Sequence, residues 1–293
     1  MRSRNLMLPF PHEKEKPLSS FSTFKIGGPA RFFSEVRTKE EMQERLLFCH
    51  KHGLSFFILG KGSNTLFDDR GFNGLVILNR IDYLTVSKNI FRAGAGYSFA
   101  RLGMKSANLG CSGLEFAAGI PATVGGAIFM NAGAGGQETK DTLLDVLYIT
   151  GEGKELRFQK SDLEFGYRFS HFQKMSGAIV EGRFSLNFSQ EAKENQKRGV
   201  DYRLDTQPYK EPSIGCIFRN PLHHRAAQLI DKCGLKGVEE GGVQVSTKHA
   251  NFIVNLKTGK AQDVLRLIGK IKERVFIDTG ITLEEEVRFI PYE

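Results

Sequence analysis

The chain has 293 residues, of which 40% are hydrophobic and 25% are charged, and this excludes wholesale disorder. This length allows one large domain or two to three ordinary ones. The net charge is +8, from 41 Lys and Arg against 33 Asp and Glu, which favours anionic partners. Because the basic residues are scattered and no basic patch with interleaved aromatics occurs, phosphorylated small molecules are favoured over nucleic acid.

The cysteine and histidine spacings give no sign of a metal site. No CxxC pair occurs among the four cysteines: Cys49, Cys111, Cys216 and Cys233. The pairs His223-His224 and Lys248-His249 have no second set of ligands at metal spacing, so no metal is expected. The N-terminus lacks the apolar run of a signal peptide, and no stretch reaches membrane-spanning length. We therefore expect a reduced, soluble, cytoplasmic protein without a membrane partner.

The first 80 or so residues predict a β-α-β-β unit after an irregular lead-in over 1–20. A strand is predicted over 31–36. Thr38 then caps a helix, Glu41 completes a capping box, and Gly53 ends the helix. Strands are predicted over 55–59 and 74–78.

The middle of the chain predicts a strand and turn over 89–96, then a helix over 98–108. A Gly/Ala-rich stretch follows over 113–136, and Pro121 is placed at the first position of a short helix. Strands are predicted over 144–150 and 178–186, with a hairpin turn at 151–153. The polar, charged helix predicted over 189–207 marks a domain boundary.

The last third predicts an extended segment over 215–220 and a helix over 224–233 that Gly234 closes. A strand over 250–255, a helix over 261–276 with one apolar face, and a last strand over 282–290 complete the chain.

Two glycine-rich segments are candidates for phosphate binding. The stretch 119–136 holds six glycines in 18 residues, and small residues let the backbone N–H groups approach phosphate oxygens. It matches neither GxGxxG nor GxxxxGK[ST], and tight helix packing or a flexible loop is the alternative. The turn 59–65, LGKGSNT, follows a predicted buried strand, where α/β units place phosphate-binding turns. Taken alone, a plain turn is an equally good interpretation of it.

Seven segments with distinctive motifs follow one another along the chain. They are FSTFKIGG (21–28), LGKGSN (59–64), GLEFAAGIP (113–121) with VGG (124–126) and NAG (131–133), GYR (166–168), EPSIGCIFRNP (211–221), VSTKHANF (245–252) and LEEEVRFI (283–290). Together and in this order they closely resemble the UDP-N-acetylenolpyruvoylglucosamine reductase (MurB) family of bacterial cell-wall synthesis. The resemblance covers about residues 20 to 290. The short interval between Arg168 and Cys216 is similar to that of the compact type II subgroup.

The resemblance implies an α+β fold with a two-lobed FAD-binding domain of the vanillyl-alcohol-oxidase (PCMH) type and a C-terminal α+β substrate-binding domain. Lobe 1 would be residues 1–82, joined by a C-terminal strand in 281–293. Lobe 2 would be 83–190, and the substrate-binding domain 191–280.

The activity that the resemblance implies is that of UDP-N-acetylmuramate dehydrogenase, an oxidoreductase of peptidoglycan precursor synthesis. NADPH would reduce non-covalently bound FAD and leave, and UDP-N-acetylglucosamine enolpyruvate would take its place. A hydride from the flavin would go to C3 and a proton to C2, giving UDP-N-acetylmuramate. A monomer whose partners are small molecules only is expected. Three phosphorylated ligands, FAD, NADPH and the UDP sugar, would explain the basic surplus.

Two rival functions stay open. A sugar or alcohol oxidase on the same flavin fold often attaches its flavin through His or Cys. No His lies in 60–65 or 113–136, although Cys111 is near the second stretch. A nucleic-acid-binding protein would use the net charge of +8, and its binding would weaken with salt.

Three catalytic roles follow from motif position. Arg168 would stabilise the enolate-like intermediate, because a fixed guanidinium suits charge that builds up on a carboxyl group; a structural salt bridge is the alternative. Glu286 matches the catalytic carboxylate, yet Glu284 shares its strand face by period two, so spacing alone does not choose between them. Cys216 stands where many members carry serine as the proton donor to C2. A thiol is a more acidic donor than an alcohol, although a lone Cys is usually a small buried apolar residue.

The same motifs imply two sets of binding residues. The cofactor would contact Gly60, Lys61, Gly62, Ser63, Asn64, Thr65, Gly119, Ile120, Pro121, Thr123, Gly125, Gly126, Asn131, Ala132 and Gly133. The substrate would contact Arg219, Asn220, Lys248 and Asn251. Ala122 departs from the family pattern, where a glycine often follows Gly-Ile-Pro, but its small side chain should still allow phosphate to approach.

Overall fold

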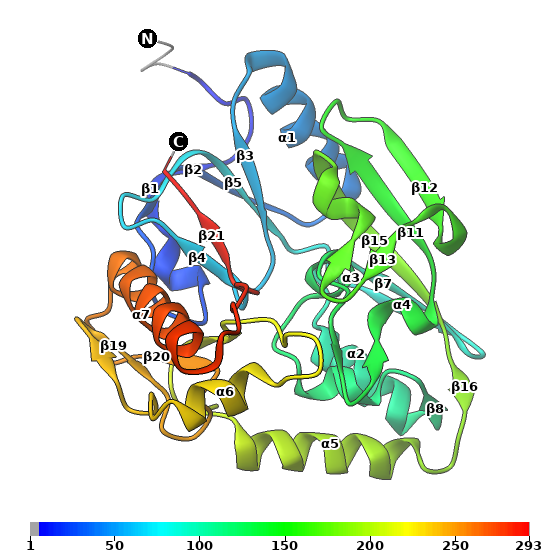
Figure 1. The fold of residues 1–293 in the computed structure, drawn as a ribbon. Coiled ribbons are helices and arrows are strands. Elements are labelled where there is room, and N and C mark those ends of the chain that lie inside the picture. Colours follow the sequence, from blue (N-terminus) through cyan, green and yellow to red (C-terminus); the bar gives the residue numbers. More distant parts are fainter. Residues whose placement is uncertain (1–5, 293) are drawn as a thin grey trace.

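The computed structural model describes residues 6–292 and has a mixed fold of helices and sheets, which confirms the predicted α+β class. Residues 1–5 of the predicted lead-in, and residue 293 of the predicted C-terminal segment, lie outside the described residues. Figure 1 shows two larger sheets, with the last part of the chain packed beside the first sheet.

The first sheet has the strand order β1-β2-β5-β3. Its strands are β1 (Glu13–Pro17), β2 (Pro29–Val36), β5 (Phe72–Asn79) and β3 (Phe56–Leu59). β5 is parallel to both β2 and β3, as expected when helix α1 (Lys39–His52) makes the crossover. The three predicted strands of this unit are confirmed.

The irregular lead-in predicted over 1–20 is wrong for its second half. Residues Glu13–Pro17 pair with β2 in antiparallel fashion, and Leu18–Phe21 form the 3₁₀ helix η1. β1 is an edge strand of alternating Glu and Lys that is almost entirely exposed, so it lacks the apolar alternation that predicts a strand.

Helix α1 begins and ends where its caps predict. The Thr38 hydroxyl accepts the N–H of Glu41 at 3.1 Å, and Gly53 ends the helix in the left-handed conformation with φ 59°. The Glu41 carboxylate accepts the N–H of Arg37 rather than that of Thr38, so the capping box is shifted by one residue.

The second sheet is antiparallel, with the order β12-β11-β15-β7-β6. Its strands are β12 (Glu155–Gln159), β11 (Leu143–Thr150), β15 (Gly177–Ser185), β7 (Ile90–Gly94) and β6 (Leu84–Ser87). The predicted strands over 89–96, 144–150 and 178–186 and the hairpin turn over 151–153 are confirmed. So is the predicted helix after β7, α2 (Phe99–Asn108), which Ser98 caps.

Helix α1 joins the two sheets through one apolar cluster. Met42 and Leu46 of α1 are fully buried, together with Leu75 of the first sheet and Ile149 of the second. Burial of apolar surface from three elements at once fixes the angle between the sheets. A separate cluster packs α2 and the glycine-rich stretch against the other face of the second sheet.

The glycine-rich stretch folds into short pieces. They are the 3₁₀ helix η2 (Glu115–Gly119), helix α3 (Val124–Phe129) and strand β9 (Gly133–Ala134). Pro121 does not start a helix: Thr123 caps α3 by accepting the N–H of Gly126 at 3.2 Å, and Pro121 lies two residues before that cap. The proline prediction is wrong because the side-chain cap, rather than the missing N–H, sets where this helix begins.

Smaller elements connect the two sheets to the rest of the chain. They are β4 (Thr65–Phe67), β8 (Cys111–Ser112), β10 (Gln137–Glu138), α4 (Thr139–Thr142), η3 (Lys160–Asp162), β13 (Phe165–Gly166), β14 (Phe169–Ser170), η4 (His171–Lys174) and β16 (Asn187–Phe188).

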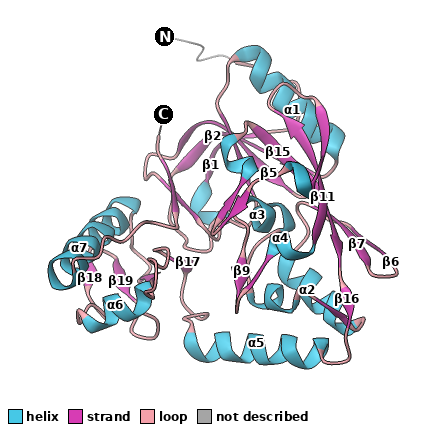
Figure 2. Cartoon of the chain, turned by 45° about the vertical axis from the view of Figure 1, so that its right-hand side comes forward, coloured by secondary structure: helices cyan, strands magenta, loops and turns pink. Residues whose placement is uncertain are grey.

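Helix α5 (Ala192–Thr206) runs beneath the second sheet and α2 and leads to the last part of the chain (Figure 2). That part contains a sheet with the order β17-β20-β19-β18 and two helices. Its elements are β17 (Ser213–Cys216), α6 (Ala226–Lys232), β18 (Glu239–Glu240), β19 (Val243–Val245), β20 (Phe252–Asn255) and α7 (Ala261–Thr279).

The chain returns to its first part through strand β21 (Arg288–Ile290), which pairs in parallel with β4 (Figure 1). The strand predicted over 282–290 is therefore too long. The N–H groups of Glu286 and Val287 donate to the carbonyl of Ile217 and not to a neighbouring strand of a ladder. Residues 282–287 therefore lie outside β21. No helix among residues 6–292 is long and apolar enough to span a lipid bilayer.

Candidate active site

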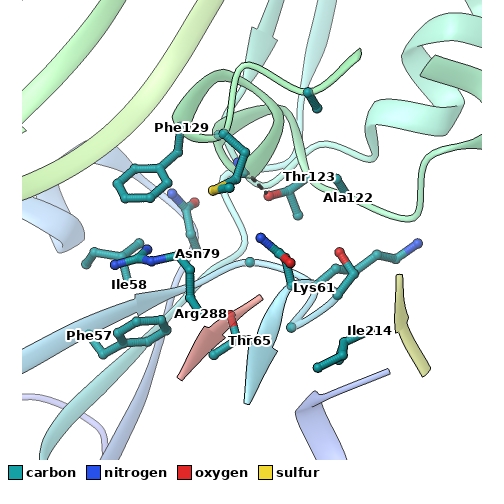
Figure 3. A pocket seen from close by; sticks show the side chains of 18 of the residues that line it. Phe57, Ile58, Lys61, Thr65, Asn79, Ala122, Thr123, Phe129, Ile214 and Arg288 are labelled. Carbon is teal, nitrogen blue, oxygen red and sulfur yellow. Dashed lines mark hydrogen bonds between the residues drawn. The ribbon is translucent and has the colours of Figure 1, made fainter. Parts of the chain in front are cut away.

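One cavity of about 1240 Å³ is lined by both glycine-rich segments and by all three residues with predicted catalytic roles. This volume exceeds the roughly 300–1,000 Å³ of most small-ligand sites. In the view of Figure 3, Phe57, Ile58 and Arg288 lie to one side of the cavity, and Ala122 and Thr123 lie to the other.

The turn 60–65 follows β3 and forms part of the first wall. Gly62 has φ 62°, and a Cβ there would lie 2.3 Å from the carbonyl oxygen of Phe21, so only glycine fits. Among the described residues, the N–H groups of Lys61, Gly62 and Ser63 have no hydrogen-bond acceptor. A row of unpaired backbone donors beside a cavity suits a phosphate group.

The N-terminal part of α3 forms the facing wall, with Thr123, Gly125 and Gly126 on the cavity. The two walls meet closely at one point, because a Cβ on Gly60 would lie 2.6 Å from the Thr123 hydroxyl. Glycine at position 60 is therefore needed for a steric reason that involves the facing wall.

Most predicted cofactor contacts line the cavity. Those that do are Gly60, Lys61, Gly62, Ser63, Asn64, Thr65, Ile120, Pro121, Thr123, Gly125, Gly126, Ala132 and Gly133. Gly119 and Asn131 are not in its lining. The Gly119 carbonyl accepts hydrogen bonds from Arg203 and from the Tyr209 hydroxyl, the latter at 2.6 Å. Asn131 is fully buried, and its Nδ2 donates to the carbonyl of Gly166 at 2.9 Å.

Arg168 and Glu286 form an ion pair at the cavity. Arg168 Nε donates to Glu286 Oε1 at 2.7 Å, and its Nη2 donates to the Gly133 carbonyl at 3.2 Å. Arg168 has φ 55°, in the left-handed region that side chains disfavour. Burial raises the pKa of Glu286, and the charge of Arg168 opposes that rise.

Glu284 and Glu286, which the sequence spacing does not distinguish, differ in their position relative to the cavity. Glu286 lines the cavity, whereas Glu284 is exposed and outside the lining. The Glu284 carbonyl instead accepts the N–H of Arg219.

Cys216 lies at the end of β17 and lines the same cavity. The ladder between β17 and β20 is irregular between Ser213 and Cys216, and Gly215 has φ 80°. Burial, with a smaller contribution from the nearby carboxylate of Glu286, raises the pKa of the Cys216 thiol to about 12. The thiol is therefore protonated at neutral pH, as a proton donor must be.

The four predicted substrate contacts lie outside the lining of this cavity, and their binding role stays a prediction. Asn251 holds the segment after Cys216: its Oδ1 accepts the N–H of Phe218 at 3.0 Å and its Nδ2 donates to the Phe218 carbonyl at 2.8 Å. Asn220 Oδ1 accepts the N–H of Ala226 at the start of α6, at 3.0 Å. Lys248 Nζ donates to the Leu204 carbonyl at 2.6 Å. Arg219 carries a buried Nε that has no partner among the described residues.

Sequence reasoning missed two arginines at the cavity. Arg288 places its guanidinium 4.6 Å from the ring centroid of Phe129, and burial lowers its pKa (Figure 3). It lies two residues after Glu286 in the same predicted motif, and that proximity could have marked it. Arg203 also lines the cavity, and its charge opposes the rise in the pKa of Cys216. Its place on a polar helix gave no such signal.

Comparisons with known proteins agree with this geometry. Residues 207–290 match the family model described as UDP-N-acetylenolpyruvoylglucosamine reductase, C-terminal domain, and residues 30–159 match an FAD binding domain. The chain is 53% identical to a UDP-N-acetylenolpyruvoylglucosamine reductase of Protochlamydia amoebophila, over 98% of this chain and 97% of the relative. It is 45% identical to that of Chlamydia abortus over the same shares. The crystal structure of UDP-N-acetylenolpyruvylglucosamine reductase from Thermus caldophilus superposes with a TM-score of 0.83 at 34% identity, covering 96% of this chain and 99% of that one.

Proposed function

Because the chain belongs to the UDP-N-acetylenolpyruvoylglucosamine reductase (MurB) family, we propose that it reduces UDP-N-acetylglucosamine enolpyruvate to UDP-N-acetylmuramate with NADPH as the reductant. It is an FAD-dependent oxidoreductase of peptidoglycan precursor synthesis. The observation that carries the proposal is one cavity that joins both glycine-rich walls to Arg168, Cys216 and Glu286.

The residues present fit FAD. The unpaired N–H groups of Lys61, Gly62 and Ser63 suit its phosphates, and the bare glycines of both walls let an extended ligand lie close to the backbone. We propose the cofactor contacts accordingly, with Arg288 and Arg203 as further cations in the cavity. Once NADPH has reduced it, bound FAD would supply the hydride that adds to C3 of the enolpyruvyl group.

The protein's own side chains would handle charge and protons. Hydride addition at C3 places negative charge on the adjoining carboxylate system, and the Arg168 guanidinium, fixed by two hydrogen bonds, stabilises it. Cys216 gives its thiol proton to C2. Glu286 orients Arg168 and holds the thiol in its protonated form by raising its pKa.

We also propose that the chain works as a monomer in three parts: lobe 1 (1–82, with the C-terminal strand), lobe 2 (83–190) and a substrate-binding domain (191–280). Two core clusters support this division: one is dominated by residues from Ile214 onward, and one lies within 91–186. A third cluster joins the two lobes to each other.

The test is anaerobic. NADPH should bleach the flavin absorbance, and addition of enolpyruvyl-UDP-N-acetylglucosamine should restore it in proportion to the substrate added. The Cys216→Ser variant should retain substantial turnover, whereas Cys216→Ala should still be bleached by NADPH but fail to reoxidise. A wild-type enzyme that stays bleached after the sugar nucleotide is added would refute the proposed substrate and leave only the flavin assignment.

A further inference from the structure

The hairpin that carries Arg168 is attached to the end of helix α3 by a small set of polar contacts. Gln173 Nε2 donates to the carbonyl of Arg168 at 3.0 Å and to the carbonyl of Phe129 at 2.9 Å. The Ser170 hydroxyl donates to the same Phe129 carbonyl at 2.7 Å. Asn131 completes the set through the carbonyl of Gly166.

The chemistry of the Gln173 amide matches its surroundings. A side-chain NH₂ group has two N–H donors, and here each meets one backbone carbonyl. Phe129 is the last residue of α3, where carbonyls lack partners within the helix. Gln173 therefore serves the helix end and the hairpin with one group.

The hydrogen bond from Gln173 to the Arg168 carbonyl holds a residue whose backbone conformation is strained. Arg168 occupies the two-residue turn between β13 and β14 with φ 55°, a conformation that a residue with a side chain keeps only when its surroundings hold it. The Gln173 bond fixes the carbonyl of that residue. The orientation of the carbonyl sets where the guanidinium meets Glu286 and the cavity.

We infer that Gln173, which nothing in the sequence motifs marks, is a positioning residue for the oxidative half of the reaction: it holds the Arg168 turn against the end of α3 so that the guanidinium faces the reacting substrate. The inference rests on the proposed function. It implies that Gln173 matters when the enolpyruvyl sugar is reduced and does not matter when NADPH reduces the flavin.

The experiment compares rapid kinetics of the two half-reactions in wild type and in Gln173→Met, which keeps the length of the side chain and removes both donors. We expect flavin reduction by NADPH to change less than about twofold and reoxidation by enolpyruvyl-UDP-N-acetylglucosamine to slow by about 10- to 100-fold, since misplacement of a catalytic group by an ångström has effects of that size. Equal slowing of both half-reactions, or no slowing of reoxidation, would overturn the inference.

Two matched variants separate positioning from mere structure. Ser170→Ala removes a bond to the same Phe129 carbonyl but leaves the bond to Arg168, so reoxidation should slow far less than in Gln173→Met. Gln43→Met removes a similar bond, from a glutamine to the Gly153 carbonyl at 2.7 Å. Neither residue lines the cavity, and the variant should leave both half-reactions unchanged. Slowing by Ser170→Ala as large as that by Gln173→Met would assign the effect to the end of α3 and contradict the inference.

A double-variant cycle tests whether Gln173 acts through Arg168. In an Arg168→Met background, Gln173→Met should slow reoxidation by less than a further twofold or so, whereas independent effects would multiply. If Gln173→Met does not retain flavin, the isosteric Gln173→Glu replaces it. Loss of flavin in both variants would overturn the inference, because Gln173 itself lines the cavity and would then act in holding FAD. If the wild-type flavin is not reoxidised by the sugar nucleotide, the proposed function itself is overturned. If the wild type is reoxidised and Gln173→Met is reoxidised at the same rate, only the inference about Gln173 is overturned.

Discussion

Arg168 and Glu286 are 118 positions apart in the chain, and a 2.7 Å hydrogen bond from Nε to Oε1 joins them at the cavity. Arg168 lies on the two-residue turn between β13 and β14, and Glu286 lies on the segment that returns from α7 to β21. The pair therefore closes the site only when both parts of the chain are in place. Both charges also act on the Cys216 thiol, whose pKa burial raises: the Glu286 carboxylate raises that pKa further toward its value of about 12, and the Arg168 guanidinium lowers it.

The ionisation of Glu286 should be visible in the pH dependence of stability. Burial raises its pKa above the usual 4.5, so the protonated form is favoured in the folded protein. The sign follows from linkage: the unfolded state releases this proton at lower pH, so stability falls as the pH rises from 4.5 through the raised pKa. The Glu286→Gln variant should lose less unfolding free energy than wild type over that rise, in urea denaturation with FAD held constant. A variant curve parallel to that of wild type would contradict the raised pKa.

The Cys216 thiol should resist alkylation in the folded protein. A pKa of about 12 in place of 9.0 lowers the thiolate fraction at pH 8 by about 10³-fold, and the thiolate is the form that reacts. Iodoacetamide labelling followed by peptide mass spectrometry should show slow labelling of Cys216 in the apoprotein and rapid labelling after unfolding. In Glu286→Gln the labelling should speed up, because the negative charge of Glu286 raises the pKa. Fast labelling of the folded wild type would show that the thiol is not protonated as described.

Local signals predicted the parts of the fold whose causes are local. Thr38 and Gly53 bound α1 because a side-chain cap and a left-handed glycine act within one helical turn. The glycine-rich segments predicted the cavity walls for a similar reason. Small side chains leave the backbone accessible to a ligand, and this depends on the segment itself and not on distant contacts.

The remainder depended on contacts that sequence spacing does not contain. The predicted last strand was too long because the Glu286 N–H donates to the carbonyl of Ile217, far away in the chain. β1 was missed because an exposed edge strand of Glu and Lys carries no apolar alternation. The role of Gln173 follows from carbonyls that only the folded chain brings to its amide.

The backbone strain at Arg168 should reverse the usual order of stability of alanine and glycine variants. At φ 55° glycine is relaxed and alanine is not, so Arg168→Gly should be more stable than Arg168→Ala by about 1 kcal/mol. Both variants lose the bond to Glu286, so their difference isolates the backbone. Arg101, which lies in α2, provides the opposite control. There the alanine variant should be more stable than the glycine variant by about 1 kcal/mol. Urea denaturation of the four variants checks this, and the same sign at both positions would remove the case for strain at Arg168.

The close approach of the two cavity walls gives a prediction for FAD binding. A methyl group added at Gly60 would lie 2.6 Å from the Thr123 hydroxyl, which is itself held by capping Gly126. Thr123 has little freedom to move away, so Gly60→Ala should push the walls apart and weaken FAD binding by about tenfold, or about 1.4 kcal/mol. Fluorescence titration of the apoprotein with FAD measures this change. Gly199→Ala on α5 is the control, because nothing lies within 4 Å of the added methyl there, and its FAD affinity should equal that of wild type.

A second substitution shows whether the clash with Thr123 is the cause. Thr123→Ala removes the hydroxyl and costs the α3 cap about 1 kcal/mol, so alone it should weaken the site slightly. Combined with Gly60→Ala, however, it also removes the clash, and the double variant should bind FAD more tightly than Gly60→Ala alone. Such a coupling is expected only for residues in direct contact. If the two losses simply add, then Gly60 does not contact Thr123, and the two cavity walls do not meet at this point in the working enzyme.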